Sequence, residues 1–158
     1  MGDTDIIDAL LERCRFSEDD IDLATSGLCA TFALSLYRDL LKRGIETDLV
    51  LICLADKDGK PACGQKSGNI FWKHVAVRHN DNYYDIYGNE KLTDMISNYC
   101  WDNPRGSGGV PVQVTFKHLT KIMRDHKPAY DRQYRLNWKA RLAGVDLSDL
   151  MQPVFFAR

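Results

Sequence analysis

Three residues, Cys29, His74 and Asp85, carry the side chains that a nucleophilic cysteine enzyme uses. In such an enzyme the sulfur attacks a carbonyl carbon, an imidazole moves the proton, and a carboxylate fixes the tautomer of that imidazole. The three residues are far apart in the sequence, so this chemistry depends on the elements that position them. We therefore predict a Cys–His–Asp triad and ask which helix and strands would bring it together.

Cys29 lies at the start of the strongest helical pattern in the chain, LCATFALSLYRDLLKRG. The free N–H groups and the positive dipole of a helix N-terminus favour a thiolate, and such cysteines have pKa values of roughly 3.5–7.5. Gly27 lets the backbone approach a ligand closely, and the N–H of Cys29 is the expected oxyanion donor. We therefore expect iodoacetamide to label Cys29 before the other four cysteines at about pH 6–7.

His74 and Asp85 lie on two strand-like runs, residues 72–79 and 83–87, separated by Asn80-Asp81-Asn82. A two-residue type I′ turn through Asn80-Asp81 would place Ala76 opposite Asp85. The side chains of His74 and Asp85 would then be diagonal neighbours on one face, with Cβ atoms roughly 7–8 Å apart. A three-residue loop would put them on opposite faces, so the hypothesis depends on this register.

Each of these residues also has a purely structural interpretation. Cys29 shares an apolar helical stripe with Phe32 and Leu36, so it fits a core position. His74 fits a core histidine, and Asp85 fits an acidic residue at the edge of a sheet. The order of the three residues and the expected hairpin favour the catalytic interpretation.

The surrounding pattern predicts an α+β fold, in which an antiparallel sheet packs against the helix that carries Cys29. We expect a single domain over residues 1–158, with a catalytic core at 26–88 and a C-terminal helical part at 117–144. The other expected elements are helices over 3–15, 90–100, 118–126 and 130–144, strands over 47–55 and 110–116, and loops over 56–69 and 102–109. Residues 16–27 are an expected polar connector, in which Ser17 before three acidic residues indicates a short capped turn.

Composition narrows the class of protein. The chain has 158 residues, a net charge of −1 and 44% hydrophobic residues, so disordered and low-complexity classes are excluded. No apolar run is long enough to span a bilayer, and the acidic N-terminus does not fit a secretory signal. We predict a cytoplasmic protein that does not bind membranes.

The five cysteines are odd in number and form no CxxC motif, which argues against a disulfide framework. We expect no metal and no cofactor. A zinc site that combines Cys53, Cys63 and Cys100 with a histidine would require scattered ligands to converge, and it stays open as an alternative.

The segment from 26 to 88 resembles the core of the papain-like, transglutaminase-like superfamily of cysteine enzymes. The matching motifs are Gly27-Leu28-Cys29 at the head of a helix, Gly44-Ile45 before a strand, His74-Val75-Ala76-Val77, and Tyr84-Asp85 on the next strand. The chain has no Gln shortly before Cys29, unlike papain. Its Asp85 resembles the third residue of transglutaminases and arylamine acetyltransferases.

The resemblance implies Cys29 as nucleophile, His74 as general base and Asp85 as the orienting acid. It further implies a hydrolase or acyl transferase that acts on an amide-type carbonyl, such as a protease, an isopeptidase or a glutamine deamidase with a protein or peptide substrate. Gly27, Leu28 and Trp72, which flank the nucleophile and the base, are the expected substrate-binding residues.

A rival hypothesis assigns the chain to non-catalytic binding modules. Residues 117–141 hold eight basic and two acidic side chains, interleaved with Tyr130, Tyr134 and Trp138. Such a stretch could bind a protein or a nucleic acid. An amphipathic helix with Tyr134, Trp138 and Leu142 buried explains the same pattern, and the near-neutral net charge favours it.

Overall fold

The computed structural model describes residues 2–64, 69–103, 108–125 and 130–151. The helices in these ranges are α1 (Asp3–Cys14), α2 (Glu18–Ala24), α3 (Cys29–Lys42), α4 (Leu92–Tyr99), α5 (Phe116–Asp125) and α6 (Arg132–Ala143). The strands are β1 (Asp48–Leu54), β2 (Trp72–His79), β3 (Asn82–Asp85), β4 (Gly88–Glu90) and β5 (Gly109–Val114).

The strands form one antiparallel sheet in the order β4-β3-β2-β1-β5. The α+β class and the antiparallel sheet are therefore as the sequence predicts. The central strand is β2, which carries His74. Because β2 pairs with β1 on one side and β3 on the other, its position in the sheet is fixed on both edges.

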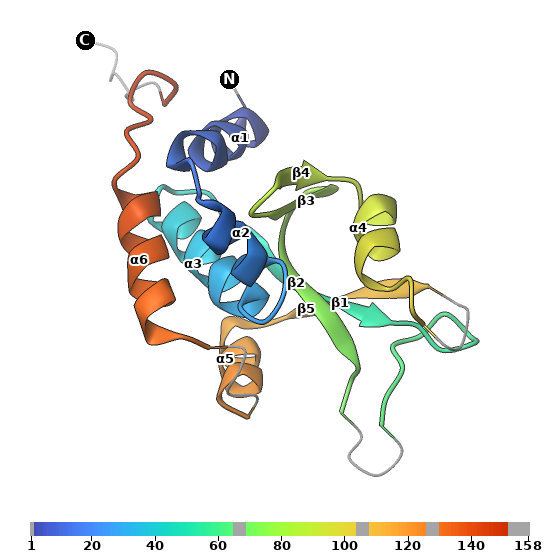
Figure 1. Cartoon of the computed structure of the whole chain (residues 1–158). Coiled ribbons are helices and arrows are strands. Elements are labelled where there is room, and N and C mark those ends of the chain that lie inside the picture. The colour runs from blue at the N-terminus through green and yellow to red at the C-terminus, as the bar shows by residue number, and fades with distance from the viewer. Residues whose placement is uncertain (1, 65–68, 104–107, 126–129, 152–158) are drawn as a thin grey trace.

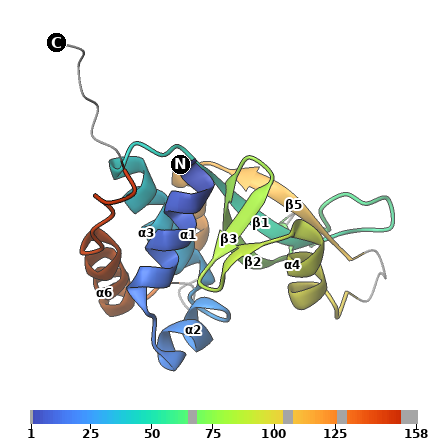
Figure 2. The same cartoon turned by 90° about the horizontal axis from the view of Figure 1, so that it is seen from above.

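Helices cover both faces of this sheet, and Figures 1 and 2 show α3 on one side and α4 on the other. The α3 face packs Leu49, Leu51, Val75 and Val77 against the apolar stripe of the helix. The opposite face packs Val50, Ile52 and Ala76 around Met95 of α4. Adjacent strand residues thus enter different cores, as the two-residue period of a strand requires.

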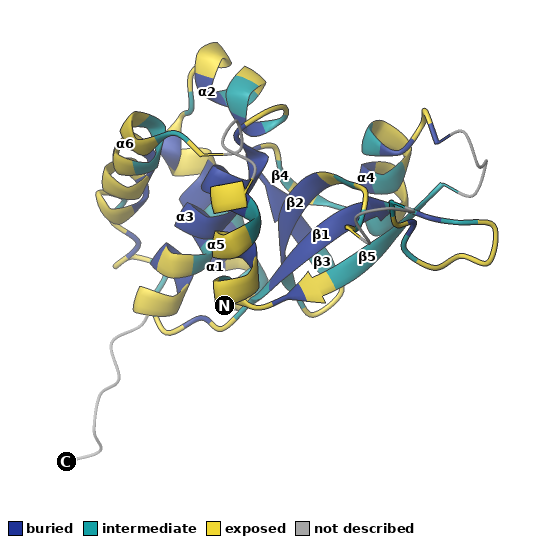
Figure 3. Ribbon diagram, turned by 90° about the horizontal axis from the view of Figure 1, so that it is seen from below, coloured by how far each residue is buried: buried dark blue, intermediate teal, exposed yellow. Residues whose placement is uncertain are grey.

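Helix α3 lies at the centre of the larger core. Figure 3 shows it buried along most of its length, while α5 and α6 expose their outer surfaces. Phe32 of α3 makes edge-to-face contacts with Phe16 and Trp138, at centroid distances of 5.3 and 5.4 Å. The helix ends at Lys42 and the chain leaves it at Gly44, the expected stop, whose φ of 84° suits a residue without a Cβ. This packing fixes the helix that carries Cys29.

Two elements differ from the expectation. The segment predicted as a polar connector contains α2, because Ser17 and Asp20 form a reciprocal capping box that stabilises a short helix. The strand expected over 83–87 ends at Asp85, and the chain turns back at once into β4. Within the described residues, no helix has the length and apolar character needed to cross a membrane.

Candidate active site

Cys29 is the first residue of α3, as the sequence predicts, and no side chain caps this helix N-terminus. Its sulfur accepts hydrogen bonds from the backbone N–H groups of Val75, Ala30 and Cys29 itself. These donors lower the pKa of the thiol, but Cys29 is only 1% exposed. Burial outweighs them and raises the pKa to about 11. The expectation of a lowered pKa is therefore wrong: the helix terminus is there, but water is excluded from it.

The predicted hairpin register is confirmed. Val77 pairs with Tyr84 and His79 with Asn82, so Asn80 and Asp81 form a two-residue turn. Only Asn80 has a positive φ, 54°, whereas a type I′ turn needs a positive φ at both positions. The turn type therefore differs from the expectation, but the register that the site needs is kept.

This register brings His74 and Asp85 into contact. The distance from His74 Nε2 to Asp85 Oδ2 is 3.0 Å, and the two residues are 0% and 2% exposed. The other carboxylate oxygen, Oδ1, accepts the backbone N–H of Tyr87 at 2.9 Å. Two N–H donors favour the ionised carboxylate. Asp85 therefore holds Nε2 as the protonated nitrogen and leaves Nδ1 as the basic one.

The imidazole of His74 is also held by a ring that sequence reasoning missed. Tyr99, at the end of α4, stacks on it with a centroid distance of 3.7 Å and an interplanar angle of 5°. Burial raises the pKa of the Tyr99 hydroxyl, and the charge of Asp85 adds to the rise. His74 Nδ1 is buried and has no hydrogen-bond partner within the described ranges. The base therefore has one orienting partner and one free nitrogen.

The thiol and the imidazole approach β2 from different sides. His74 pairs with Ile52 and stacks on Tyr99, so its ring lies on the α4 face. Cys29 comes from α3, yet its sulfur meets the N–H of Val75, the residue next to His74. In this hairpin the Val75 N–H points toward the side of β2 on which β3 pairs. Strand β3 ends at Asp85, so it does not extend as far as Val75. The sulfur therefore lies near the plane of the sheet, beside β2, where the β3 ladder stops.

A second acidic residue, also missed from the sequence, adjoins this group. Glu90 of β4 pairs with Tyr83 and is hydrogen-bonded through its side chain to Asp85. Burial raises the pKa of Glu90 to about 7, and the charge of Asp85 adds to the rise. A β-strand at residues 88–90 was not expected, so no sequence signal placed Glu90 beside Asp85.

An open groove of about 850 Å³ lies beside the N-terminus of α3. Two of the three expected substrate-binding residues, Gly27 and Trp72, line it together with Phe71 and Ile122. The third, Leu28, is 6% exposed and packs in the core instead. The groove therefore reaches the backbone two residues before Cys29.

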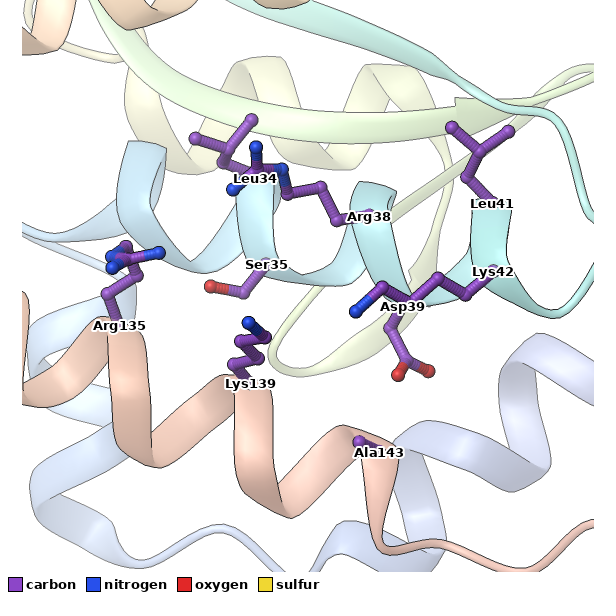
Figure 4. A pocket seen from close by; sticks show the side chains of 9 residues that line it. All are labelled: Leu34, Ser35, Arg38, Asp39, Leu41, Lys42, Arg135, Lys139 and Ala143. Atoms are coloured by element: carbon purple, nitrogen blue, oxygen red, sulfur yellow. The ribbon is translucent and has the colours of Figure 1, made fainter.

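A smaller cavity of about 340 Å³ lies elsewhere, along the C-terminal half of α3. Figure 4 shows Arg135 and Lys139 of α6 on one wall and Arg38 and Lys42 of α3 on the other. The one acidic residue in its lining, Asp39, forms an ion pair with Arg43 at 2.7 Å. This basic cavity is lined by neither the proposed triad nor its neighbours.

The remaining cysteines do not form a second candidate site. Cys14, Cys53 and Cys100 are buried and Cys63 is exposed. Across the residues whose positions are described, no three His, Cys, Asp or Glu side chains gather in a way that could hold a metal ion.

Comparisons of this chain with protein families, with curated proteins and with solved structures found no match. The resemblance to papain-like and transglutaminase-like enzymes therefore depends on the residues of this chain alone. It stays a prediction.

Proposed function

We propose that this protein is a cysteine hydrolase or acyl transferase with Cys29 as nucleophile, His74 as general base and Asp85 as the orienting acid. The observation that carries the proposal is the buried His74–Asp85 pair, in which Nδ1 has no partner among the described residues. The next residue in the sequence, Val75, donates its backbone N–H to the Cys29 sulfur. A buried imidazole with one nitrogen satisfied and the other unpartnered is suited to accept a proton.

The raised pKa of Cys29 determines how the reaction begins. At neutral pH the thiol keeps its proton, since its pKa is about 11. The proton therefore moves to His74 Nδ1 as the sulfur attacks the carbonyl carbon, and no thiolate forms beforehand. The carbonyl oxygen becomes an oxyanion, for which the N–H of Cys29 is the donor we propose.

The second half of the reaction follows from the same groups. The protonated imidazole gives its proton to the leaving amine, the C–N bond breaks, and the acyl group stays on sulfur. Water or an amine then attacks this thioester, passes its proton to His74, and releases Cys29 as a thiol. The groove beside Gly27 suits a protein or peptide substrate, so a protease, an isopeptidase or a glutamine deamidase is the narrower form of the proposal.

Access to the thiol needs a local movement, because Cys29 is only 1% exposed.

The basic groups of α6 do not supply a better supported function. Trp138 is 1% exposed and donates its indole N–H to Asp20, and Tyr134 packs against Trp138. The Trp138 ring is therefore committed to contacts within the protein and is not free to stack on nucleic acid bases.

The test is acyl transfer from p-nitrophenyl acetate to the chain, followed by mass spectrometry of each cysteine. We expect an acetyl group on Cys29, and we expect Asp85→Asn to slow its formation by about a hundredfold or more, since the general base loses its orientation. We expect His74→Gln to slow the acetylation of Cys29 by a similar factor. Cys63→Ser is the matched control, because it removes an exposed thiol that plays no part in the proposal.

The proposal is wrong if acetylation of Cys29 has the same rate in the parent chain, in His74→Gln and in Asp85→Asn. It is also wrong if only Cys63 is acetylated. Circular dichroism of each variant shows whether a slow rate reflects unfolding, and His74→Gln gives a second reading where Asp85→Asn does not fold.

A further inference from the structure

Glu90 occupies an unusual place behind the His74–Asp85 pair. It lies opposite Tyr83 on the β3–β4 ladder, on the face of the sheet that carries Asp85 and His74. Its oxygen Oε2 is buried and finds no partner in the part of the chain that the structure describes. Its side chain meets the carboxyl group of Asp85. A buried carboxylate oxygen with no donor is costly when the group is ionised.

Two carboxyl groups can share a hydrogen bond only if one of them holds a proton. Asp85 receives N–H donors on both oxygens, from His74 Nε2 at 3.0 Å and from the Tyr87 backbone at 2.9 Å. Those donors stabilise its ionised form. Glu90 Oε2 has no donor among the residues that the structure describes, so we place the proton on Glu90, with its O–H directed to Asp85.

We propose that Glu90 is a positioning residue: in its protonated form it donates a hydrogen bond to Asp85 and so completes a buried chain of Glu90, Asp85 and His74. Its role in positioning rests on the proposed function, whereas the hydrogen-bonded chain itself does not. The burial that raises the pKa of Glu90 to about 7 agrees with a proton held near neutral pH.

The charged and titratable groups around Glu90 determine how the hydrogen bond between Glu90 and Asp85 depends on pH. Asp85 on β3 and Asp94 on α4 disfavour its ionised form, while His74 on β2 favours it. The charge of Glu90 also contributes to the raised pKa of Tyr99 on α4. Helix α1, which packs against β4 as well, directs Asp5 and Asp8 toward Tyr84. When Glu90 ionises, a second negative charge therefore forms beside Asp85 and the hydrogen bond is lost.

The chain contains four glutamates, Glu12, Glu18, Glu46 and Glu90, so carboxyl ¹³C labelling of glutamate gives a spectrum that can be assigned. We expect one signal to titrate near pH 7 and to be absent from Glu90→Gln. If no glutamate signal titrates near pH 7, the hydrogen-bonded chain of Glu90, Asp85 and His74 does not exist. The proposed function is unaffected by that result, because no activity enters this measurement.

Acetylation of Cys29 by p-nitrophenyl acetate tests the positioning role. Glu90→Gln keeps an N–H donor for Asp85, so we expect a rate at pH 6 within about twofold of the parent chain. Glu90→Leu has no donor and should be slower by about three- to tenfold. The rate in Glu90→Gln should also lose the step near pH 7 that ionisation of Glu90 produces in the parent chain.

If Glu90→Gln and Glu90→Leu react alike and both keep the pH profile of the parent, the positioning role is wrong. Should Glu90→Leu not fold, the comparison of the two pH profiles, parent against Glu90→Gln, still decides the matter. Loss of reaction in the Cys29→Ala variant, measured in parallel, shows whether the proposed nucleophile is the group being acetylated. The two proposals therefore fail by different observations.

Discussion

At the scale of single residues, the site combines an imidazole held in a fixed orientation with a thiol that keeps its proton at neutral pH. His74 is fixed on one side by Asp85 and on its face by Tyr99, and its Nδ1 is left without a partner among the described residues. Cys29 sits at an uncapped helix N-terminus, yet burial raises its pKa to about 11. A dipole acts over one turn of helix, whereas desolvation acts on the whole charge, and here desolvation is larger.

The burial and the raised pKa of Cys29, compared with the exposure of Cys63, predict the order in which the cysteines react. We expect iodoacetamide to label exposed Cys63 first, and buried Cys29 slowly at neutral pH. In Cys63→Ser the labelling rate of Cys29 should keep rising with pH beyond the ordinary range for a thiol, about 8.5, because the reactive form is the thiolate. Mass spectrometry of each cysteine peptide between pH 6 and about pH 10 gives the profile.

A plateau in the Cys29 rate at pH 6–7 would contradict the raised pKa. It would instead show a thiolate paired with a protonated His74 at rest, as the helix-terminus argument alone predicted. Cys14, which is buried and whose pKa is also raised to about 11, is the internal reference for a cysteine without a neighbouring histidine.

At the scale of elements, α4 protects the imidazole. Its last residue, Tyr99, lies flat on the His74 ring, and His74 is fully buried beneath it. The helix is anchored by Met95, which is 0% exposed within the smaller core. The orientation of the base therefore depends on how this short helix packs against the sheet.

Removal of the Tyr99 ring should expose His74 to diethyl pyrocarbonate, which modifies accessible imidazoles. We expect Tyr99→Ala to gain modification at His74, while Tyr99→Phe keeps the stacking ring and stays protected. Exposed His118 is the positive control in the same digest. Equal protection of His74 in both variants would mean that Tyr99 does not cover the base.

At the scale of the whole molecule, the contact between Asp20 and Trp138 joins segments that are 118 residues apart. The indole N–H of Trp138 donates to Asp20 Oδ1 at 3.0 Å, and the ring packs on Phe32 of α3. Burial acts to raise the pKa of Asp20, but hydrogen bonds from Ser17 and Trp138 prevail and lower it. The contact thus connects α2, α3 and α6 around the helix that carries Cys29.

Trp138→Phe should lower the free energy of unfolding by about 1–3 kcal/mol at neutral pH, because Asp20 loses a buried donor. A lowered pKa means that this stabilisation is present above the ordinary pKa of 3.8 and is lost as pH falls below it. The variant should therefore lose less stability than the parent between neutral pH and about pH 3, as measured by urea unfolding. Trp101→Phe, at a residue 80% exposed, is the matched control and should change stability by less than about 0.5 kcal/mol.

The sequence by itself determined the positions of α3 and its end at Gly44, and it determined the register of the β2–β3 hairpin. Both depend on local signals: an apolar helical period, a glycine stop and a two-residue turn. Because register fixes which side chains share a face, the pairing of His74 with Asp85 was also predictable. The burial of Trp138 and Leu142 followed from the helical spacing in the same way.

Only the tertiary structure decided the environment of these residues. Tyr99 and Glu90 reach the site through α4 and the short strand β4, and nothing in their local sequence distinguishes them from surface residues. The pKa of Cys29 likewise depends on how much water the packed core excludes. Local periodicity indicates which residues face inward, but not which distant elements pack beside them. Burial and neighbouring charges from those elements determine the pKa values of the site residues, and the proposed chemistry depends on these pKa values.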